Sequence, residues 1–128
     1  MKIAHKVALA ALLVTVTLLA IQPAIAHHSS AGFSERPKEI TGTIKEFQFK
    51  NPHSWIQVMV ADASGKEVEW SVEWGSPNQL GRQGIRPATF SPGAKVSMRV
   101  NAMENGAPIA LFVGAKFADG KTLGRWTE

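Results

Sequence analysis

Hydrophobic and polar residues alternate in the part of the chain that follows residue 38. Ile40, Gly42 and Ile44 fall on one face of a first strand, whereas Phe47 and Phe49 continue on the other parity. A change of parity within one strand is typical of a β-bulge, because one extra residue turns every later side chain to the opposite face. The pattern therefore predicts a long first strand that is bent by a bulge.

A second and a third strand follow over residues 55–61 and 67–74, joined by a turn at 62–65. The third strand alternates most regularly, with Val68, Trp70, Val72 and Trp74 on one face and Glu67, Glu69 and Glu73 on the other. The apolar face predicts core positions, with Trp70 and Val72 among them. The acidic face predicts a solvated surface that discourages pairing at a sheet edge.

A short helix and two more strands complete the pattern. Ser76 followed by Pro77 is typical of a helix start, and Gly84 ends a predicted helix over residues 78–83. A fourth strand is expected over residues 95–102 and a fifth over 108–117, with an Asn-Gly turn between them. In the fifth strand we expect one apolar face, made of Ile109, Leu111, Val113, Ala115 and Phe117.

Three strands, a short helix and two strands form the element order of the OB-fold. We therefore expect an OB-like, five-stranded, partly open barrel over residues 39–128, with a small β-sandwich as the alternative. Residues 27–38 are polar and predict an extended N-terminal arm.

The first 26 residues have the three parts of a secretory signal peptide. Lys2 and Lys6 precede an apolar run at 7–21, and the small residues Ala24 and Ala26 follow it. The run is shorter than the roughly 20 residues of a membrane-spanning helix. We therefore predict cleavage after Ala26, a mature chain that begins at His27 and has no membrane span, and a periplasmic or secreted location.

Cleavage changes the composition that matters for function. It leaves 102 of the 128 residues, enough for one small domain, and lowers the basic residues from 14 to 12 against 10 acidic ones. Lysine and arginine do not cluster, so we expect no nucleic-acid partner. The sequence contains no cysteine, which excludes thiol chemistry and disulfides. We expect a monomer.

Several motifs of the mature chain occur together. They are His-His-Ser at 27–29, Thr-Gly-Thr-Ile-Lys-Glu-Phe at 41–47, Asn-Pro-His-Ser-Trp-Ile at 51–56, Glu-Trp-Ser-Val-Glu at 69–73 and Gly-Ser-Pro-Asn at 75–78. In this combination the chain resembles an uncharacterised family of small exported bacterial proteins, a domain of unknown function. The resemblance implies export and a compact β-fold, and it implies no activity.

Histidines are the first candidates for a ligand site. After cleavage His27 would offer both its α-amine and its imidazole to one metal ion, and His28 and His53 would add further nitrogen donors. A nitrogen-rich donor set suits Cu(II), so copper is the first metal considered. The alternative is that His27 and His28 are merely polar residues beside a cleavage site and that His53 only bonds to a turn.

Trp55 is the second candidate, because it lies on the parity opposite to Ile56 and would face outward. An outward aromatic ring on this part of an OB-like barrel can stack on a small molecule, a glycan or a protein side chain. Phosphate-binding glycine loops and nucleophile motifs are absent from the sequence. We therefore expect a non-enzymatic binding module that holds a metal ion or uses the Trp55 surface, or else an accessory domain of an envelope complex.

The predicted cleavage can be checked by the intact mass of the protein recovered from the periplasm. The mass should correspond to a chain that begins at His27. A mass that retains Met1 or Lys2 would contradict the prediction.

Overall fold

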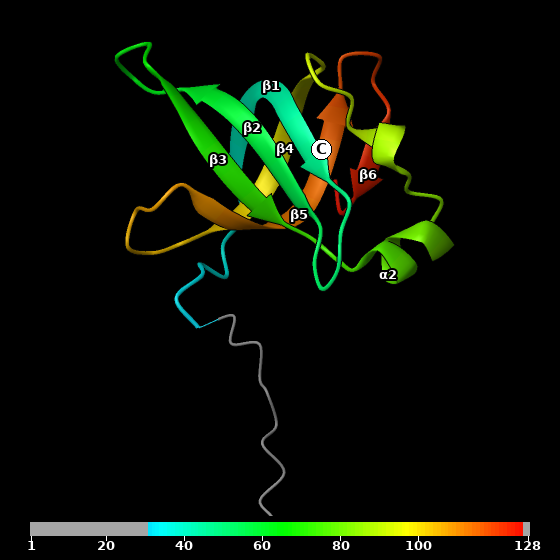
Figure 1. The fold of residues 1–128 in the computed structure, drawn as a ribbon. Coiled ribbons are helices and arrows are strands. Elements are labelled where there is room, and N and C mark those ends of the chain that lie inside the picture. The colour runs from blue at the N-terminus through cyan, green and yellow to red at the C-terminus, as the bar shows by residue number, and fades with distance from the viewer. Residues whose placement is uncertain (1–30, 127–128) are drawn as a thin grey trace, which may run out of the picture.

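The computed structural model describes residues 31–126, which form one sheet that closes on itself (Figure 1). The strands are β1 (Lys38–Gln48), β2 (Trp55–Ala61), β3 (Glu67–Glu73), β4 (Lys95–Ala102), β5 (Ile109–Phe117) and β6 (Thr122–Gly124). Helix α2 (Pro77–Arg82) and the 3-10 turn η1 (Pro87–Thr89) lie between β3 and β4. The strand order is β3-β2-β1-β4-β5-β6, and β3 also pairs with β5.

β1 contains the predicted bulge. Ile44 is paired with Val58 and Glu46 with Gln57, so Lys45 is the extra residue. The first half of β1 pairs with β4 and the second half with β2, and both pairings are antiparallel. Gly42 lies at the changeover, where a Cβ atom would come within 2.2 Å of the carbonyl oxygen of Met59. Only glycine therefore fits where β1 passes so close to β2.

The barrel closes where β3 and β5 run parallel over three residue pairs, from Ser71–Ile109 to Glu73–Leu111. This closure confirms the predicted OB-like, five-stranded barrel, with β6 as an extra strand on β5. The alternative of a β-sandwich does not apply, because all six strands belong to one sheet.

The turn between β2 and β3 is fixed by Asp62. Its carboxylate accepts hydrogen bonds from the hydroxyl of Ser64 at 2.6 Å and from the N–H groups of Ser64 and Lys66. The Ser64 hydroxyl, together with these backbone donors, holds the pKa of the Asp62 carboxyl below its usual value. Gly65 completes the turn at a positive φ of 84°, which glycine adopts without strain.

Helix α2 begins where the sequence predicts. The hydroxyl of Ser76 accepts from the N–H of Gln79 at 3.3 Å, and the Gln79 side chain accepts from the N–H of Ser76 at 3.2 Å. This reciprocal pair is a capping box, and Pro77 occupies the first helical position. The helix buries Leu80 and ends just before Gly84, whose φ is +81°.

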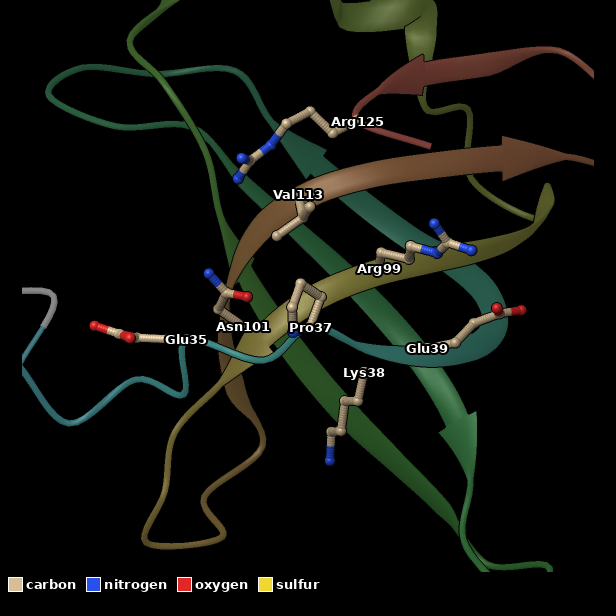
Figure 2. A pocket seen from close by; sticks show the side chains of 8 residues that line it. All are labelled: Glu35, Pro37, Lys38, Glu39, Arg99, Asn101, Val113 and Arg125. Atoms are coloured by element: carbon tan, nitrogen blue, oxygen red, sulfur yellow. The ribbon is translucent and has the colours of Figure 1, made fainter. Parts of the chain in front are cut away.

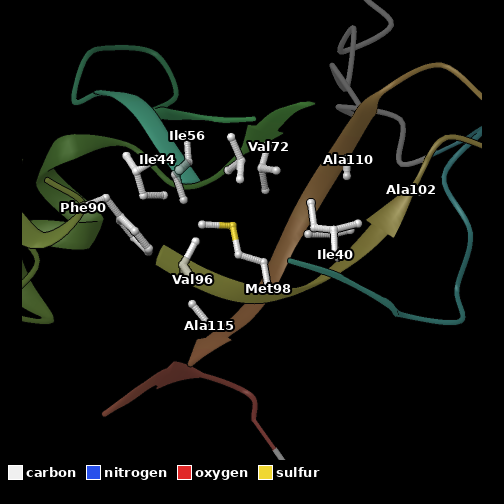
Figure 3. Packing of buried hydrophobic residues seen from close by; sticks show 12 residues of the cluster. Ile40, Ile44, Ile56, Val72, Phe90, Val96, Met98, Ala102, Ala110 and Ala115 are labelled. Atoms are coloured by element: carbon white, nitrogen blue, oxygen red, sulfur yellow. The ribbon is translucent and has the colours of Figure 1, made fainter. Parts of the chain in front are cut away.

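The core inside the barrel consists of aliphatic side chains, Met98 and Phe90, with further phenylalanines packed at its margin (Figure 3). Phe90, from the irregular segment between α2 and β4, is completely buried. Its ring makes edge contacts with Phe47 and Trp74, at centroid distances of 5.4 and 6.1 Å. Figure 3 shows Phe90 at one end of the cluster and Ala102 at the other.

The expected apolar face of β5 is wrong over its first half. A register shift between Arg99 and Val100 pairs Val100 with Phe112 and Arg99 with Gly114, so Val113 is an extra residue. The inward side chains are therefore Ala110 and Phe112, followed by Ala115 and Phe117. Ile109 and Leu111 are only partly buried. The bulge restores the expected parity at Ala115.

The chain segments before and after the barrel lie against β4 and β5. Phe33 forms a bridge with Met103 just beyond β4. After β6, the N–H of Arg125 donates to the carbonyl oxygen of Val113 at 2.9 Å. A Cβ atom on Gly114 would come within 2.4 Å of the Arg125 carbonyl oxygen, so this close approach requires glycine.

The predicted signal peptide lies outside the described residues, as do His27 and His28. Within residues 31–126, no helix has the length and apolar character needed to cross a bilayer.

The expected core positions of β3 are confirmed for Val72 and only in part for Trp70. Val72 is completely buried, whereas Trp70 is half-buried and packs at the margin of the core. The reason is that the β2–β3 hairpin extends beyond the wall of the barrel at its turn, as Figure 1 shows. The first residues of β3 therefore contact only the margin of the core.

We predict that Phe90→Ala lowers the free energy of unfolding by about 3–5 kcal/mol, the range for a fully buried phenylalanine. Trp70→Ala should cost less than about 3 kcal/mol, because part of its ring already contacts water. Urea unfolding of both variants measures the difference. A larger loss for Trp70→Ala than for Phe90→Ala would contradict this order.

Candidate functional site

His53 lies in the turn that joins β1 to β2, and two hydrogen bonds hold this turn against the end of β3. The N–H of Ser54 donates to the carbonyl oxygen of Gly75 and the N–H of Trp74 donates to that of Ser54, both at 2.9 Å. The peptide bond between Asn51 and Pro52 is cis. Because Ser54 is completely buried, the chain on the C-terminal side of His53 is fixed in place.

The imidazole of His53 forms a hydrogen bond with the carboxylate of Glu73, through Nδ1 and Oε1. An ionised carboxylate only accepts, so the Nδ1 atom carries the proton in this bond. The other ring nitrogen, Nε2, is then the one with which His53 would bind a metal ion. Both side chains are partly buried, at 29% exposure for His53 and 22% for Glu73.

Strand register brings these two residues together. Trp55 at the start of β2 is paired with Glu73 at the end of β3, and His53 precedes Trp55 by two residues. The sequence places Glu73 in the acidic stripe of β3, which we expected to be solvated throughout. Glu67 and Glu69 do fit that expectation, since both are exposed. Glu73 differs because it lies at the barrel end, beside the His53 turn.

Trp55 begins β2, where it is half-buried and has Gln48 and Glu73 as its partners on the two neighbouring strands. Its neighbour Ile56 is completely buried, so Trp55 lies on the outer side of the sheet, as its parity predicts. Its strand partner Glu73 is the residue that bonds to His53. The structure brings together one predicted metal ligand and the predicted aromatic residue.

Of the three predicted metal ligands, only His53 lies within the described residues. Among residues 31–126, histidines, aspartates and glutamates form no group of three or more that could hold a metal ion. A metal site at His53 therefore needs donors from another part of the chain.

The segment before β1 brings the N-terminal part of the chain toward the same end of the barrel. The N–H of Ser34 donates to Ala102 and the N–H of Glu104 donates to Gly32, both at 2.8 Å. Phe33 is separated from Ser71 by three strand spacings, through Met103 and Ile109, a distance of about 14 Å along the wall. Glu73 lies two residues farther along β3.

A separate pocket of about 650 Å³ lies on the opposite side of β4 and β5 from the core (Figure 2). Arg99 and Asn101 of β4, Val113 of β5 and Arg125 line it together with residues of the N-terminal segment. Neither His53 nor Trp55 belongs to this pocket. The guanidinium of Arg99 lies 4.7 Å from the ring centroid of Trp126, which holds this arginine against the C-terminal segment.

Comparison with known proteins gives one match. The model of a family of unknown function (DUF6152) matches residues 15–112, about three quarters of the chain. No curated protein and no solved structure shows significant similarity to the chain. The match is consistent with the resemblance noted from the sequence motifs.

The His53–Glu73 bond predicts which tautomer the neutral ring adopts. In the folded protein the proton should be on Nδ1, and long-range ¹H–¹⁵N correlation spectra distinguish the two nitrogens. Glu73→Ala removes the acceptor and should reduce the Nδ1–H population, whereas Glu69→Ala, on the same face of β3, should leave it unchanged. Spectra of the parent that show the proton on Nε2 would refute the assignment.

Proposed function

We propose that this chain, which belongs to the DUF6152 family of unknown function, is an exported, non-enzymatic binding module that holds a metal ion, with copper as the first candidate. The ligands would be the amine and imidazole of His27, together with His28 and His53. The observation that carries the proposal is the bond between His53 Nδ1 and Glu73, which orients the ring.

Metal-binding histidines usually donate their second ring nitrogen to a carboxylate or a carbonyl group. This outer contact fixes the orientation of the ring and makes the ligating nitrogen more basic. The carboxylate of Glu73 makes such a contact with Nδ1 of His53. The fixed turn around Ser54 keeps the imidazole in one place, which lowers the entropic cost of binding a ligand there.

The proposal requires the N-terminal segment to reach His53. From Phe33, the distance to Glu73 is about 16 Å when three strand spacings are combined with two residues along β3. Ala31 and Gly32 form a turn before Phe33, so residues 27–30 and the side chains of His27 and His53 would have to span the remaining distance. The donor atoms would all be nitrogen, and such a set favours Cu(II) over ions that prefer oxygen ligands.

A second candidate function uses the Trp55 surface to bind a glycan, a small molecule or a protein side chain. It is favoured by the position of the half-buried Trp55 ring between Gln48 and Glu73. An apolar ring face with polar groups on both sides is a common arrangement in ligand sites. This function does not need a free amine at His27, so it can be separated experimentally from metal binding.

The metal proposal can be tested by calorimetric titration of Cu(II) into the processed protein, after its N-terminus has been confirmed as His27. We expect one ion to bind per chain. One extra alanine before His27 moves the free amine and should weaken binding at least tenfold. His53→Ala should weaken it as well, and Glu73→Ala should do so by about tenfold, the lower limit for loss of an outer contact.

Trp55→Ala is the matched control, because it changes the same surface without removing a nitrogen donor. It should leave the affinity for Cu(II) unchanged. It should reduce only the binding of a glycan, a small molecule or a protein side chain to the Trp55 surface. If His53→Ala binds Cu(II) as well as the parent does, the barrel takes no part in the site. If the parent binds no better than a short peptide with the sequence of residues 27–30, metal binding is wrong and the Trp55 surface becomes the leading site.

A further inference from the structure

Strand β3 has one edge that β5 covers only in part. β5 pairs with β3 from Ser71 to Glu73, and at the limit of this pairing the N–H of Ser71 donates to Pro108 at 2.9 Å. N–H groups along a strand point alternately to its two edges, so those of Glu67 and Glu69 face the same side as that of Ser71. No strand of the described residues pairs with β3 on this side between Glu67 and Trp70.

The exposed edge belongs to the part of the β2–β3 hairpin that extends beyond the barrel wall (Figure 1). The bonds of the Asp62 carboxylate to Ser64 and Lys66 fix the turn at its tip. The seven pairs of the β2–β3 ladder, from Trp55–Glu73 to Ala61–Glu67, hold the other edge of β3. The open edge is therefore held in an extended conformation before any partner arrives.

A groove of about 320 Å³ lies beside this edge, on the inner side of the hairpin, and its lining combines apolar residues with Lys38 and Asp62. Val60, Val68 and Trp70 are half-buried in it, and Pro108 in the turn before β5 lines it from β5's side. The ammonium group of Lys38 lies 4.4 Å from the ring centroid of Trp70 and so covers one face of that ring. At about 320 Å³, the groove has space for one or two apolar side chains beside Lys38.

The outer side of the same edge is acidic. Glu67 and Glu69 are both exposed there, and Glu69 bonds to Lys45 of β1 at 2.5 Å. If two copies of this chain paired through β3, glutamates would lie opposite or diagonal to glutamates, and the repulsion would oppose the pairing. A strand that carries lysine or arginine at these positions would instead be attracted.

We propose that the open edge of β3 binds an extended, basic and apolar peptide segment of a partner protein. The segment would add a strand beside Glu67 and Glu69 and form hydrogen bonds with their backbone groups. Its alternate side chains would enter the groove at Val68 and Trp70. The intervening basic side chains would meet Glu67 and would compete with Lys45 for Glu69. The acidic row thus disfavours self-association and selects a basic partner.

This surface is distinct from the proposed metal site. Glu73 and His53 lie where β3 ends, whereas the open edge lies at its beginning. Failure of one proposal therefore leaves the other standing.

The test uses a six-residue peptide with capped ends that alternates lysine and valine, titrated into ¹⁵N-labelled mature protein. We expect the amide signals of Glu67 and Glu69 to shift and their exchange with solvent to slow, while that of Glu39 on β1 stays unchanged. Two control peptides have either glutamate in place of lysine or methyl groups on alternate backbone nitrogens. Both should bind at least tenfold more weakly.

Two variants of this chain separate the contributions of charge and backbone. Glu67→Lys should weaken binding of the basic peptide about fivefold and strengthen binding of the acidic one, since it reverses one cross-strand pair. Glu67→Pro removes the N–H group on the open edge and should also weaken binding. Glu35→Lys makes the same charge change on the segment before β1 and should have no effect.

Equal affinity for the parent and N-methylated peptides would overturn the proposal, because strand addition requires backbone hydrogen bonds. It would also be overturned if no amide signal of β3 moved at millimolar peptide. A concentration-dependent dimer that pairs through Glu67 and Glu69 in the absence of peptide would show that a second copy occupies the edge, and would equally overturn it.

Discussion

The whole barrel depends on the bulge at Lys45. One strand has to belong to two pairings at once, with β4 along its first half and with β2 along its second half. A regular strand of this length would keep one direction and one parity. The extra residue bends β1 and returns its later side chains to the inside, so that both Ile44 and Phe47 reach the core. Closure by β3 and β5 follows from that bend, because it brings the two ends of the sheet together.

The elements that could be predicted from the sequence are those with a local physical signal. The parity change in β1, the Ser76 cap and the Asp-Ala-Ser-Gly turn each depend on residues that are neighbours in the chain. Phe90 could not be found in this way, because it lies in an irregular segment without periodicity and is buried only through tertiary contacts. The bulge in β5 was hidden for a different reason. Apolar residues occupy both parities from Ile109 to Val113, so alternation does not distinguish the inside from the outside.

The candidate site shows the same division. His53 and Trp55 can be selected as single residues from their chemistry and parity. The contact of His53 with Glu73 depends on the register between β2 and β3, which joins residues 20 positions apart. An acidic stripe along a strand is usually a solvated face, and this holds for Glu67 and Glu69. Glu73 departs from it because the strand ends beside a turn that carries an imidazole.

The burial of Phe90 also limits where this protein can bind a ligand. With its ring at one end of the cluster and aliphatic side chains along the interior, the barrel is a filled cylinder rather than a container. Cargo cannot be enclosed within it, and recognition is left to the outer wall and the rims. Such a wall is stiff, since close-packed interiors resist deformation. A ligand would therefore bind to an outer surface whose shape is already set by folding. Selectivity would arise from that rigid surface and not from an internal cavity that adapts to the ligand.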